Sequence, residues 1–307
     1  MDHALLPPGF AAGTPSAHGT PLPSYAHLVK HPGWFSPRWA TMYLYIADQS
    51  LNQIDIFPLM KPNQPQAGAI TAGIDGPYGL WYERQTQSLY VANQNNSTVT
   101  MYSHGSITPK RTYSEGLSRP LYPIVDNNGV LYVGNANNGT VVEYSPGSIH
   151  VHQTLQTPGI EADGLALDKH ENLYVAFRRD NGAGDAGIEE FPPGSTQGKV
   201  LGMSLDEPQG VIVTDDGTIV ATESGSTNRI DVFPAGSSTP SLEVPMPQGS
   251  VATELAIDCR VKLLYVSGLY SGAVFKIKYP LPGESLIEQD QVSATIQGTT
   301  VTDNDNN

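Results

Sequence analysis

One short motif recurs six times along this chain, and its spacing limits the folds that the chain can adopt. It reads Leu-Tyr-Val-Ala-Asn at 89–93, Leu-Tyr-Val-Gly-Asn at 131–135 and Leu-Tyr-Val-Ala-Phe at 173–177. Related versions occupy 44–48, 219–223 and 264–268. The second residue of each version falls at 45, 90, 132, 174, 220 and 265, so neighbouring versions are 42 to 46 residues apart. A period of this length is typical of the four-stranded blade of a β-propeller.

Each repeat also predicts the strands inside a blade. In the second repeat, apolar and small or polar residues alternate with a period of two over Leu80–Tyr82, Leu89–Ala92 and Thr98–Tyr102. That period indicates pleated strands and not helices. Asn-rich segments such as 93–97 join the strands, and asparagine suits tight hairpin turns. We name the strands A, B and C, and we expect a variable strand D before the next repeat.

These observations predict an all-β fold, a single six-bladed β-propeller with four antiparallel strands in each blade. A second marker, at 79, 123, 164, 210 and 254, lies about eleven residues before the later copies of the motif and indicates strand A. Residues 1–40 are rich in proline and glycine and have no such periodicity, so we expect a mobile lead-in there. The propeller domain is predicted to span 41–307.

The first blade lacks a strand A at the expected place, because its first clear strand is the B strand Tyr43–Asp48. One more step of 44 residues from position 254 reaches Gly298, in a segment that resembles the start of strand A in the fourth repeat. We therefore expect the C-terminal strand to close the ring inside blade 1, after a D strand of blade 6 at 292–296. Closure removes an exposed sheet edge. The alternative is that Trp34–Ala40 supplies the missing strand.

The segment Gly164-Leu-Ala-Leu-Asp168, followed by Asn172-Leu-Tyr-Val-Ala176, resembles an NHL-type repeat. Similar repeats occur in gluconolactonase- and paraoxonase-like propellers, and the resemblance covers roughly residues 40–300. It implies the architecture. It implies little about activity, because one propeller scaffold hosts hydrolases, lyases and binding modules.

Charge and composition narrow the partners. The formal net charge is −14 and the pI is about 4.8, which argues against a nucleic-acid partner because such a partner requires a basic surface. No apolar run is long enough for a membrane span. The single cysteine, Cys259, forms no internal disulfide and is expected to be packed. The low charge content and the Asn/Thr/Gly-rich turns favour an extracytoplasmic, secreted or periplasmic monomer.

Carboxylates also occur in the predicted A–B turns, at Asp126, Asp168 and Asp215, with His170 beside them. We interpret them as turn residues, since aspartate is common in hairpins. The sequences Asn96-Ser-Thr98 and Asn138-Gly-Thr140 match the glycosylation motif, but they lie in B–C turns that favour asparagine for conformational reasons.

In a propeller, the inner strands begin on one face, and the residues at their start converge on the axis. A ring of these residues is therefore the predicted small-molecule site, because a few polar groups among apolar walls are typical of such sites. The residue before each marker gives Gln297, Tyr78, Tyr122, Asp163, Gln209 and Thr253, with Glu254 at the marker of the sixth blade. The ends of the B strands add Asn93, Asn135, Phe177 and Glu223, and Arg178 follows in an outer loop.

Among these residues, Asp163 is the candidate catalytic base or metal ligand, and Tyr78 and Tyr122 are candidate oxyanion or leaving-group partners. The others are candidate substrate contacts. The resemblance implies a calcium ion held by Glu, Asn and Asp residues just before the A strands. Asp163 alone keeps a carboxylate at such a position, and calcium requires six to eight oxygen ligands. All eight histidines lie elsewhere in the sequence, so a histidine-based zinc site is not expected.

The sequence leaves three functions open. The leading one is a hydrolase of neutral or cationic esters, lactones or phosphoesters, with or without a metal ion. The alternative from another class is a non-catalytic ligand- or protein-binding propeller. The third is a structural exported module whose central channel is filled by tyrosine side chains. A plugged channel would favour the last of these, and an open pocket at Asp163 would favour the first.

Overall fold

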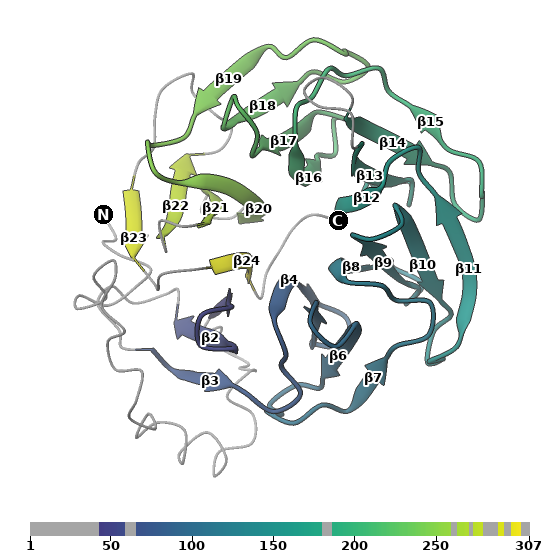
Figure 1. Cartoon of the computed structure of the whole chain (residues 1–307), viewed down its shortest axis with the longest axis vertical. Helices are drawn as coiled ribbons and strands as arrows, with labels where there is room; N and C mark the ends of the chain where they lie inside the picture. The colour runs from purple at the N-terminus through teal and green to yellow at the C-terminus, as the bar shows by residue number, and fades with distance from the viewer. Residues whose placement is uncertain are drawn as a thin grey trace.

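Six antiparallel sheets of four strands each are arranged as blades around a central axis (Figure 1). The structure is a computed structural model that describes residues 43–58, 66–179, 186–258, 263–269, 273–278, 288–291 and 296–301. The six-bladed β-propeller predicted from the repeat is therefore confirmed. Within the described ranges, no helix is long and apolar enough to cross a membrane.

The strands of the first three blades follow, each from the axis outwards. Blade 1 contains β24 (Ile296–Val301), β1 (Tyr43–Asp48), β2 (Gln53–Pro58) and β3 (Gly68–Ile70). Blade 2 contains β4 (Pro77–Glu83), β5 (Ser88–Asn93), β6 (Thr98–Tyr102) and β7 (Arg111–Tyr113). Blade 3 contains β8 (Pro120–Val125), β9 (Leu131–Asn135), β10 (Thr140–Tyr144) and β11 (Val151–Gln156).

The last three blades repeat the same order. Blade 4 contains β12 (Glu161–Leu167), β13 (Leu173–Arg178), β14 (Gly187–Phe191) and β15 (Lys199–Val200). Blade 5 contains β16 (Pro208–Val213), β17 (Ile219–Glu223), β18 (Arg229–Phe233) and β19 (Leu242–Pro245). Blade 6 contains β20 (Val251–Asp258), β21 (Leu263–Leu269), β22 (Ala273–Lys278) and β23 (Glu288–Gln291).

The C-terminal strand closes the ring, as the sequence predicted. Strand β24 pairs antiparallel with β1, with Tyr45 opposite Thr300 and Ala47 opposite Gly298, and it contacts both β20 and β4. The alternative donor, 34–40, lies outside the described residues. The predicted D strand of blade 6 was wrong in its bounds, since β23 ends at Gln291 and Ile296 already belongs to β24. Strand D varies between blades, so the repeat could not fix its position.

Each inner strand carries an irregularity close to the axis. In β12, Ala162 pairs with Phe177 and Leu165 pairs with Val175, so the two residues between them oppose a single residue of β13. The same shift occurs in β4, β8, β16 and β20. A bulge of this kind bends the strand and redirects the bulged side chains. In this ring it is the local feature that positions the candidate site.

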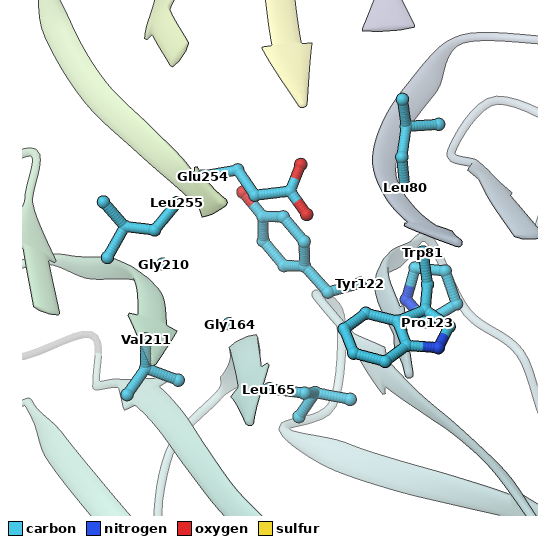
Figure 2. A pocket seen from close by; sticks show the side chains of 10 residues that line it. All are labelled: Leu80, Trp81, Tyr122, Pro123, Gly164, Leu165, Gly210, Val211, Glu254 and Leu255. Atoms are coloured by element: carbon cyan, nitrogen blue, oxygen red, sulfur yellow. The ribbon is translucent and has the colours of Figure 1, made fainter. Parts of the chain in front are cut away.

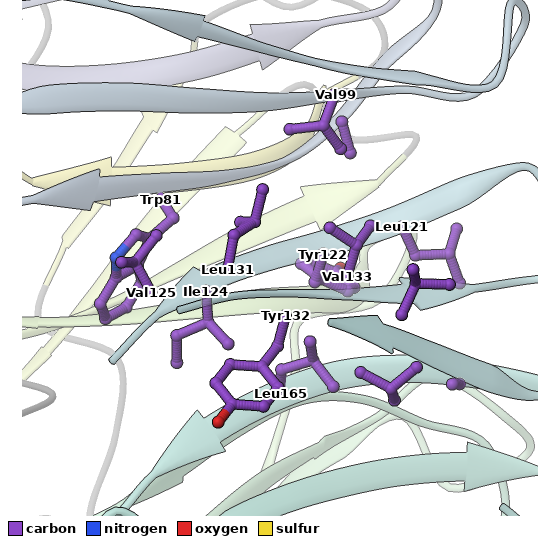
Figure 3. Close-up of a cluster of buried hydrophobic side chains, with 14 of the residues drawn as sticks. Trp81, Val99, Leu121, Tyr122, Ile124, Val125, Leu131, Tyr132, Val133 and Leu165 are labelled. Carbon is purple, nitrogen blue, oxygen red and sulfur yellow. The ribbon is translucent and has the colours of Figure 1, made fainter. Parts of the chain in front are cut away.

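The apolar core lies between neighbouring blades, and the repeated tyrosine of the B strands contributes to it. Tyr45 is fully buried and stacks on Tyr82 of the next blade, with ring centroids 6.1 Å apart. Figure 3 shows one such cluster, in which Trp81 from β4, Val125 from β8 and Leu165 from β12 come together. A single blade has two apolar faces and cannot bury them alone, so the repeat requires a closed ring.

In blades 2 and 3, the tyrosine at the end of strand C bonds to the loop that precedes the inner strand of the same blade. The Tyr102 hydroxyl donates to the Ala72 carbonyl at 2.6 Å, and the Tyr144 hydroxyl donates to the Glu115 carbonyl. Both rings are fully buried. These bonds fix the loops that lead into β4 and β8, and thereby the start of these two strands at the channel mouth.

Candidate ligand site in the central channel

The bulges of the inner strands direct the predicted ring residues to the channel. Tyr78, Asp163, Gln209 and Thr253 occupy the first bulged position of β4, β12, β16 and β20. Blade 3 differs from the expected alignment by one residue. Pro123 pairs with Val133 of β9 as Leu80 pairs with Val91 of β5, so these two residues are equivalent. The residue equivalent to Tyr78 is therefore Leu121.

Tyr122 therefore occupies the second bulged position, which is glycine in three other blades. A Cβ atom on Gly164 would lie 2.3 Å from the Gln209 carbonyl oxygen of the next blade. A Cβ on Gly79 would lie 2.3 Å from the Tyr122 ring. The glycines thus let adjacent inner strands approach closely. Tyr122 and Glu254, which replace glycine in blades 3 and 6, extend into the remaining central space (Figure 2).

A hydrogen bond across the ring covers the mouth of the channel. The Tyr78 hydroxyl of blade 2 donates to Gln209 Oε1 of blade 5, the opposite blade, at 2.9 Å. The Tyr78 ring also meets the Tyr122 ring edge to face, with centroids 5.4 Å apart and an interplanar angle of 73°. Tyr78 and Gln209 are half-buried. We call this pair the roof.

Two polar groups beneath the roof are buried and lack hydrogen bonds. Asp163 is 1% exposed and Tyr122 is 3% exposed. Neither Asp163 Oδ2 nor the Tyr122 hydroxyl has a hydrogen-bond partner among the described residues. The Tyr78 and Tyr122 hydroxyls are close enough for each to affect the pKa of the other. Buried polar groups are usually paired, so these two are candidates for contact with a ligand or water.

The free space beneath the roof is small. The cavity that Tyr122, Gly164, Gly210 and Glu254 help to line has a volume of about 20 Å³ (Figure 2). A water molecule requires a cavity of roughly 10–15 Å³ by this kind of measure. This cavity therefore holds about one water molecule, and Tyr78, Asp163 and Gln209 are not among the residues that line it.

Burial controls the ionisation of this site. Desolvation, and then the neighbouring Glu161 carboxylate, raise the pKa of Asp163 well above its usual value, against the opposing effect of Arg178 and Arg119. Desolvation and the charge of Asp163 also raise the pKa of Tyr78. Desolvation, with Tyr78 and then Glu254 adding to it, raises the pKa of Tyr122. Removing an acid from water favours its neutral form, so the site presents hydroxyl donors.

The rim of the mouth carries charges of both signs. Arg178 donates to Glu161 Oε2 through Nε at 2.9 Å and also lies 3.4 Å from Glu207 Oε1. Arg119 is exposed, has a positive φ of 54°, and forms no ion pair within the described ranges. Asp206 accepts bonds from the Ser226 backbone and hydroxyl. Arg178 and Arg119 thus offset part of the negative charge of Glu161 and Glu207 at this mouth.

The predicted contacts at the ends of the B strands lie at the same face, but their side chains hold loops. Asn93 accepts a bond from the Asp75 backbone amide at 3.0 Å, and Asn135 accepts one from the Ser118 amide at 2.9 Å. Both are fully buried. Their role as ligand contacts remains a prediction, and their observed contacts position the loops that precede the inner strands.

Blades 4 and 5 fill the same position differently. Glu223 is 1% exposed and accepts bonds from the backbone amides of Asp206 and Glu207. Phe177 is buried, and the Arg179 guanidinium lies 5.5 Å from the centre of its ring. The recurring polar residue after strand B is thus a loop cap, and blade 4 replaces it with an aromatic side chain.

Two further ring residues predicted as substrate contacts are Thr253 and Gln297. The Thr253 hydroxyl donates to the Ser267 carbonyl at 3.2 Å within its own blade, and Thr253 is buried. The side chain of Gln297 lies outside the described part of the structure, although its backbone belongs to β24. The structure therefore brings Tyr78, Tyr122 and Asp163 together with Gln209, while the B-strand residues lie behind them.

Sequence reasoning missed one residue that shapes the ring. The Thr222 hydroxyl accepts the Gly210 backbone amide at 2.7 Å and donates to the Thr253 carbonyl, so it locks the inner strands of blades 5 and 6 together. The sequence contained one sign of this role, a hydroxyl side chain at a position of strand B that is alanine or glycine in blades 2 to 4. The equivalent residue of blade 6 is serine.

The residues at the axis do not fit the calcium site that the resemblance implied. Among the described residues, no group of three or more His, Cys, Asp or Glu side chains could hold a metal ion. Asp163 is the one carboxylate at its level of the described ring, and burial favours its neutral form.

Comparisons with known proteins agree on the fold only. No family model matches the chain, and no curated protein matches its sequence, so the NHL resemblance is not confirmed. A chain from the crystal structure of a nidogen/laminin complex is similar, with a TM-score of 0.70 and 16% identity. That similarity covers 85% of this chain and 98% of the other.

Hydrazine synthase from Kuenenia stuttgartiensis also contains a similar chain, with a TM-score of 0.63 and 12% identity over 83% of this chain and 85% of that one. At these identities the similarity shows the fold alone. It supports the six-bladed β-propeller and carries neither the activity nor the partners of either protein.

Proposed function

We propose that this protein is a ligand-binding propeller whose site is the roofed mouth of its central channel, and that it works by recognition and not by turnover. The ligand is a small polar molecule that accepts hydrogen bonds from the neutral Asp163 carboxyl and the Tyr122 hydroxyl. Displacing the bond between Tyr78 and Gln209 opens the site.

The main support for this proposal is that two buried polar atoms, Asp163 Oδ2 and the Tyr122 hydroxyl oxygen, lack a hydrogen-bond partner among the described residues. Leaving a buried hydroxyl or carboxyl without a partner costs roughly 1–3 kcal/mol, and a ligand that bonds to Asp163 Oδ2 and the Tyr122 hydroxyl recovers this energy. The cavity that Tyr122 lines has room for about one water molecule, so a larger ligand binds only after the site opens.

A screen of polar metabolites by thermal shift tests the proposal. Compounds that bind the site are expected to raise the melting temperature of the wild type but not of Asp163→Leu or Tyr122→Phe, because neither replacement side chain can donate a hydrogen bond. Asparagine would not serve at position 163, since its amide N–H could donate in place of the neutral carboxyl. Asp168→Asn serves as the control, because Asp168 is an aspartate in the A–B turn of the same blade, away from the mouth. Hits that bind equally well to Asp163→Leu would show that the site is elsewhere.

Opening of the roof can be tested separately. Tyr78→Phe removes the hydroxyl that bonds to Gln209 but keeps the ring. We expect faster association of any ligand found, since the closed form then loses one hydrogen bond. Unchanged association kinetics would contradict the role of this pair as a roof.

A hydrolase of esters, lactones or phosphoesters is the second candidate, and the state of Asp163 favours it. A buried carboxyl with a raised pKa is suited to donate a proton to a leaving group near neutral pH. The Tyr122 hydroxyl beside it would stabilise the developing negative charge.

An activity panel separates the two candidates. Esters, lactones and phosphoesters are assayed with added calcium and with a chelator, so that any requirement for a divalent cation is seen. Turnover that falls by about 100-fold in Asp163→Asn would favour the hydrolase. Specific binding without turnover across the panel would favour recognition.

We further propose that the protein is an extracytoplasmic monomer with no nucleic-acid or membrane partner. The acidic composition, with a net charge of −14, supports the absence of a nucleic-acid partner. Cell fractionation and light scattering are the corresponding tests, and cytoplasmic or oligomeric protein would contradict this part of the proposal.

A further inference from the structure

A second cavity, much larger than the channel cavity, lies at the opposite end of the inner strands. It occupies the space between the A–B turns of blades 2 and 3 and has a volume of about 220 Å³. Its lining comes from two short segments, 81–85 and 125–127. A cavity of roughly 150 Å³ lined by apolar side chains is large enough to bind benzene. This second cavity therefore has room for a small organic molecule.

Trp81 supplies the apolar wall of this cavity. It is 6% exposed and packs in the cluster between blades 2 and 3, near Val125 (Figure 3). Its indole nitrogen Nε1 has no hydrogen-bond acceptor among the described residues. The equivalent residues of β8 and β12 are Ile124 and Ala166, by their register with the B strands. A tryptophan therefore occupies this position in blade 2 but not in blades 3 and 4.

The polar part of the wall is mainly acidic. Glu83 and Asp126 are both buried to more than nine-tenths. Asp126 accepts bonds from the backbone amides of Asn128 and Val130 through Oδ1, and its Oδ2 has no hydrogen-bond partner in the described ranges. Arg84 is the one cation among the lining residues, and it is exposed.

A third carboxylate lies close to the cavity. Glu171 of the next blade accepts a 2.5 Å hydrogen bond from Asn127 Nδ2, and Asn127 is itself a lining residue. The local charge is therefore negative, with three carboxylates against one guanidinium. An anion would be repelled here, and a cation would be attracted.

We propose that this cavity binds a small organic cation that carries an aromatic ring. The ring packs on the Trp81 wall, and the ammonium group lies next to Asp126. This site is independent of the proposed function at the channel mouth.

Three matched compounds test the class of ligand: tyramine, its neutral alcohol analogue tyrosol, and the anion para-hydroxyphenylacetate. They share the phenol ring and differ mainly in charge. The chain has three tryptophans, Trp34, Trp39 and Trp81, so Trp34→Phe/Trp39→Phe leaves Trp81 as the only one. With fluorotryptophan incorporated, fluorine NMR then reports on this wall directly.

Tyramine is expected to shift the Trp81 resonance saturably, with tyrosol weaker and the anion weakest. Asp126→Asn keeps the acceptor for the turn but removes the charge, and it should weaken tyramine binding by about tenfold, the scale of one partly buried charge contact. Asp168→Asn changes the equivalent turn of blade 4 and should leave binding unchanged.

Three outcomes would overturn the proposal. The absence of a saturable shift with any of the three compounds would show that the cavity is not a site for them. Equal affinity for all three would refute the cationic class. If Asp126→Asn and Asp168→Asn lose tyramine affinity equally, the effect comes from the overall charge of the protein and not from this cavity.

Discussion

Asp55 is expected to destabilise the propeller at neutral pH, and its replacement by asparagine should stabilise it. Asp55 lies on β2 and is 1% exposed. Its Oδ1 accepts hydrogen bonds from Gln53 Nε2 at 2.7 Å and Gln66 Nε2 at 2.6 Å. Desolvation, and then the charge of Asp48, raise the pKa of Asp55 from 3.8 to about 8.

The sign follows from proton linkage. A carboxyl whose pKa is raised on folding binds protons more tightly in the folded state, so its contribution is most favourable below pH 4 and is lost as the pH rises towards 8. Each pKa unit corresponds to about 1.4 kcal/mol. The cost of keeping Asp55 buried is therefore about 1.5 kcal/mol at pH 5, about 4 kcal/mol at pH 7 and about 5 kcal/mol at pH 8.

Asparagine removes this cost and keeps most of the contacts. Its amide oxygen can accept both glutamine bonds, and the fold does not require a charge here. The equivalent residues of β6, β10 and β22 are Thr100, Val142 and Phe275, and those of β14 and β18 are the carboxylates Glu189 and Asp231, as their pairing with the B strands shows. Three of the six blades thus form without a carboxylate at this position.

Urea unfolding across this pH range is the measurement. We expect the free energy of unfolding of Asp55→Asn to exceed that of the wild type by several kcal/mol at pH 8. This difference should shrink as the pH falls to 5. Asp216→Asn is the control of opposite sign, because hydrogen bonds from Thr214 and Thr218 lower the pKa of Asp216. A difference for Asp55→Asn that is negative, or that does not change with pH, would refute the reasoning.

Three further predictions concern the closure, the anchors and the loop caps of the ring. Truncation after residue 282 removes β24 and leaves β1 without its inner partner, so cooperative thermal unfolding should be lost; an unchanged calorimetric transition would contradict the closure. Tyr102→Phe loses the bond to the Ala72 carbonyl and should lower the free energy of unfolding by about 1 kcal/mol in urea titration, while its exposed neighbour variant Asn96→Ala should change little. Asn135→Ala removes the bonds to the loop before β8 and should cost about 1–3 kcal/mol with faster amide exchange at Ser118; exchange that stays slow would show that the loop is held by other contacts.

The number of blades, the four-strand pattern and the closing strand followed from the sequence, because each depends on short-range properties. Alternation with a period of two places Leu89 and Val91 on one face of β5, whatever else the chain does. The marker at Gly298 identified β24, because the segment around it resembles the segment around Gly164 and repeats of one unit adopt one local structure.

The candidate site could be predicted only in part. The sequence selected Tyr78, Asp163 and Gln209 as axial residues, and the structure places them together at the mouth. It misplaced the register of blade 3 by one residue. A bulge is set by the hydrogen bonds between two strands, and nothing in the residues around Tyr122 reveals which of them the partner strand leaves unpaired.

The sequence by itself determined which segments form strands A, B and C, how many blades they form and which end of each inner strand faces the channel mouth. Only the tertiary structure decided what meets at the axis. The bond between Tyr78 and Gln209 joins residues 131 positions apart, and it depends on their blades being opposite each other across a ring whose inner width is set by close contacts at Gly79 and Gly164. Local periodicity fixes backbone conformation, because it acts between neighbours in the chain. The burial of Asp163, and with it the protonation of the site, depends on the packing of all six blades around the axis.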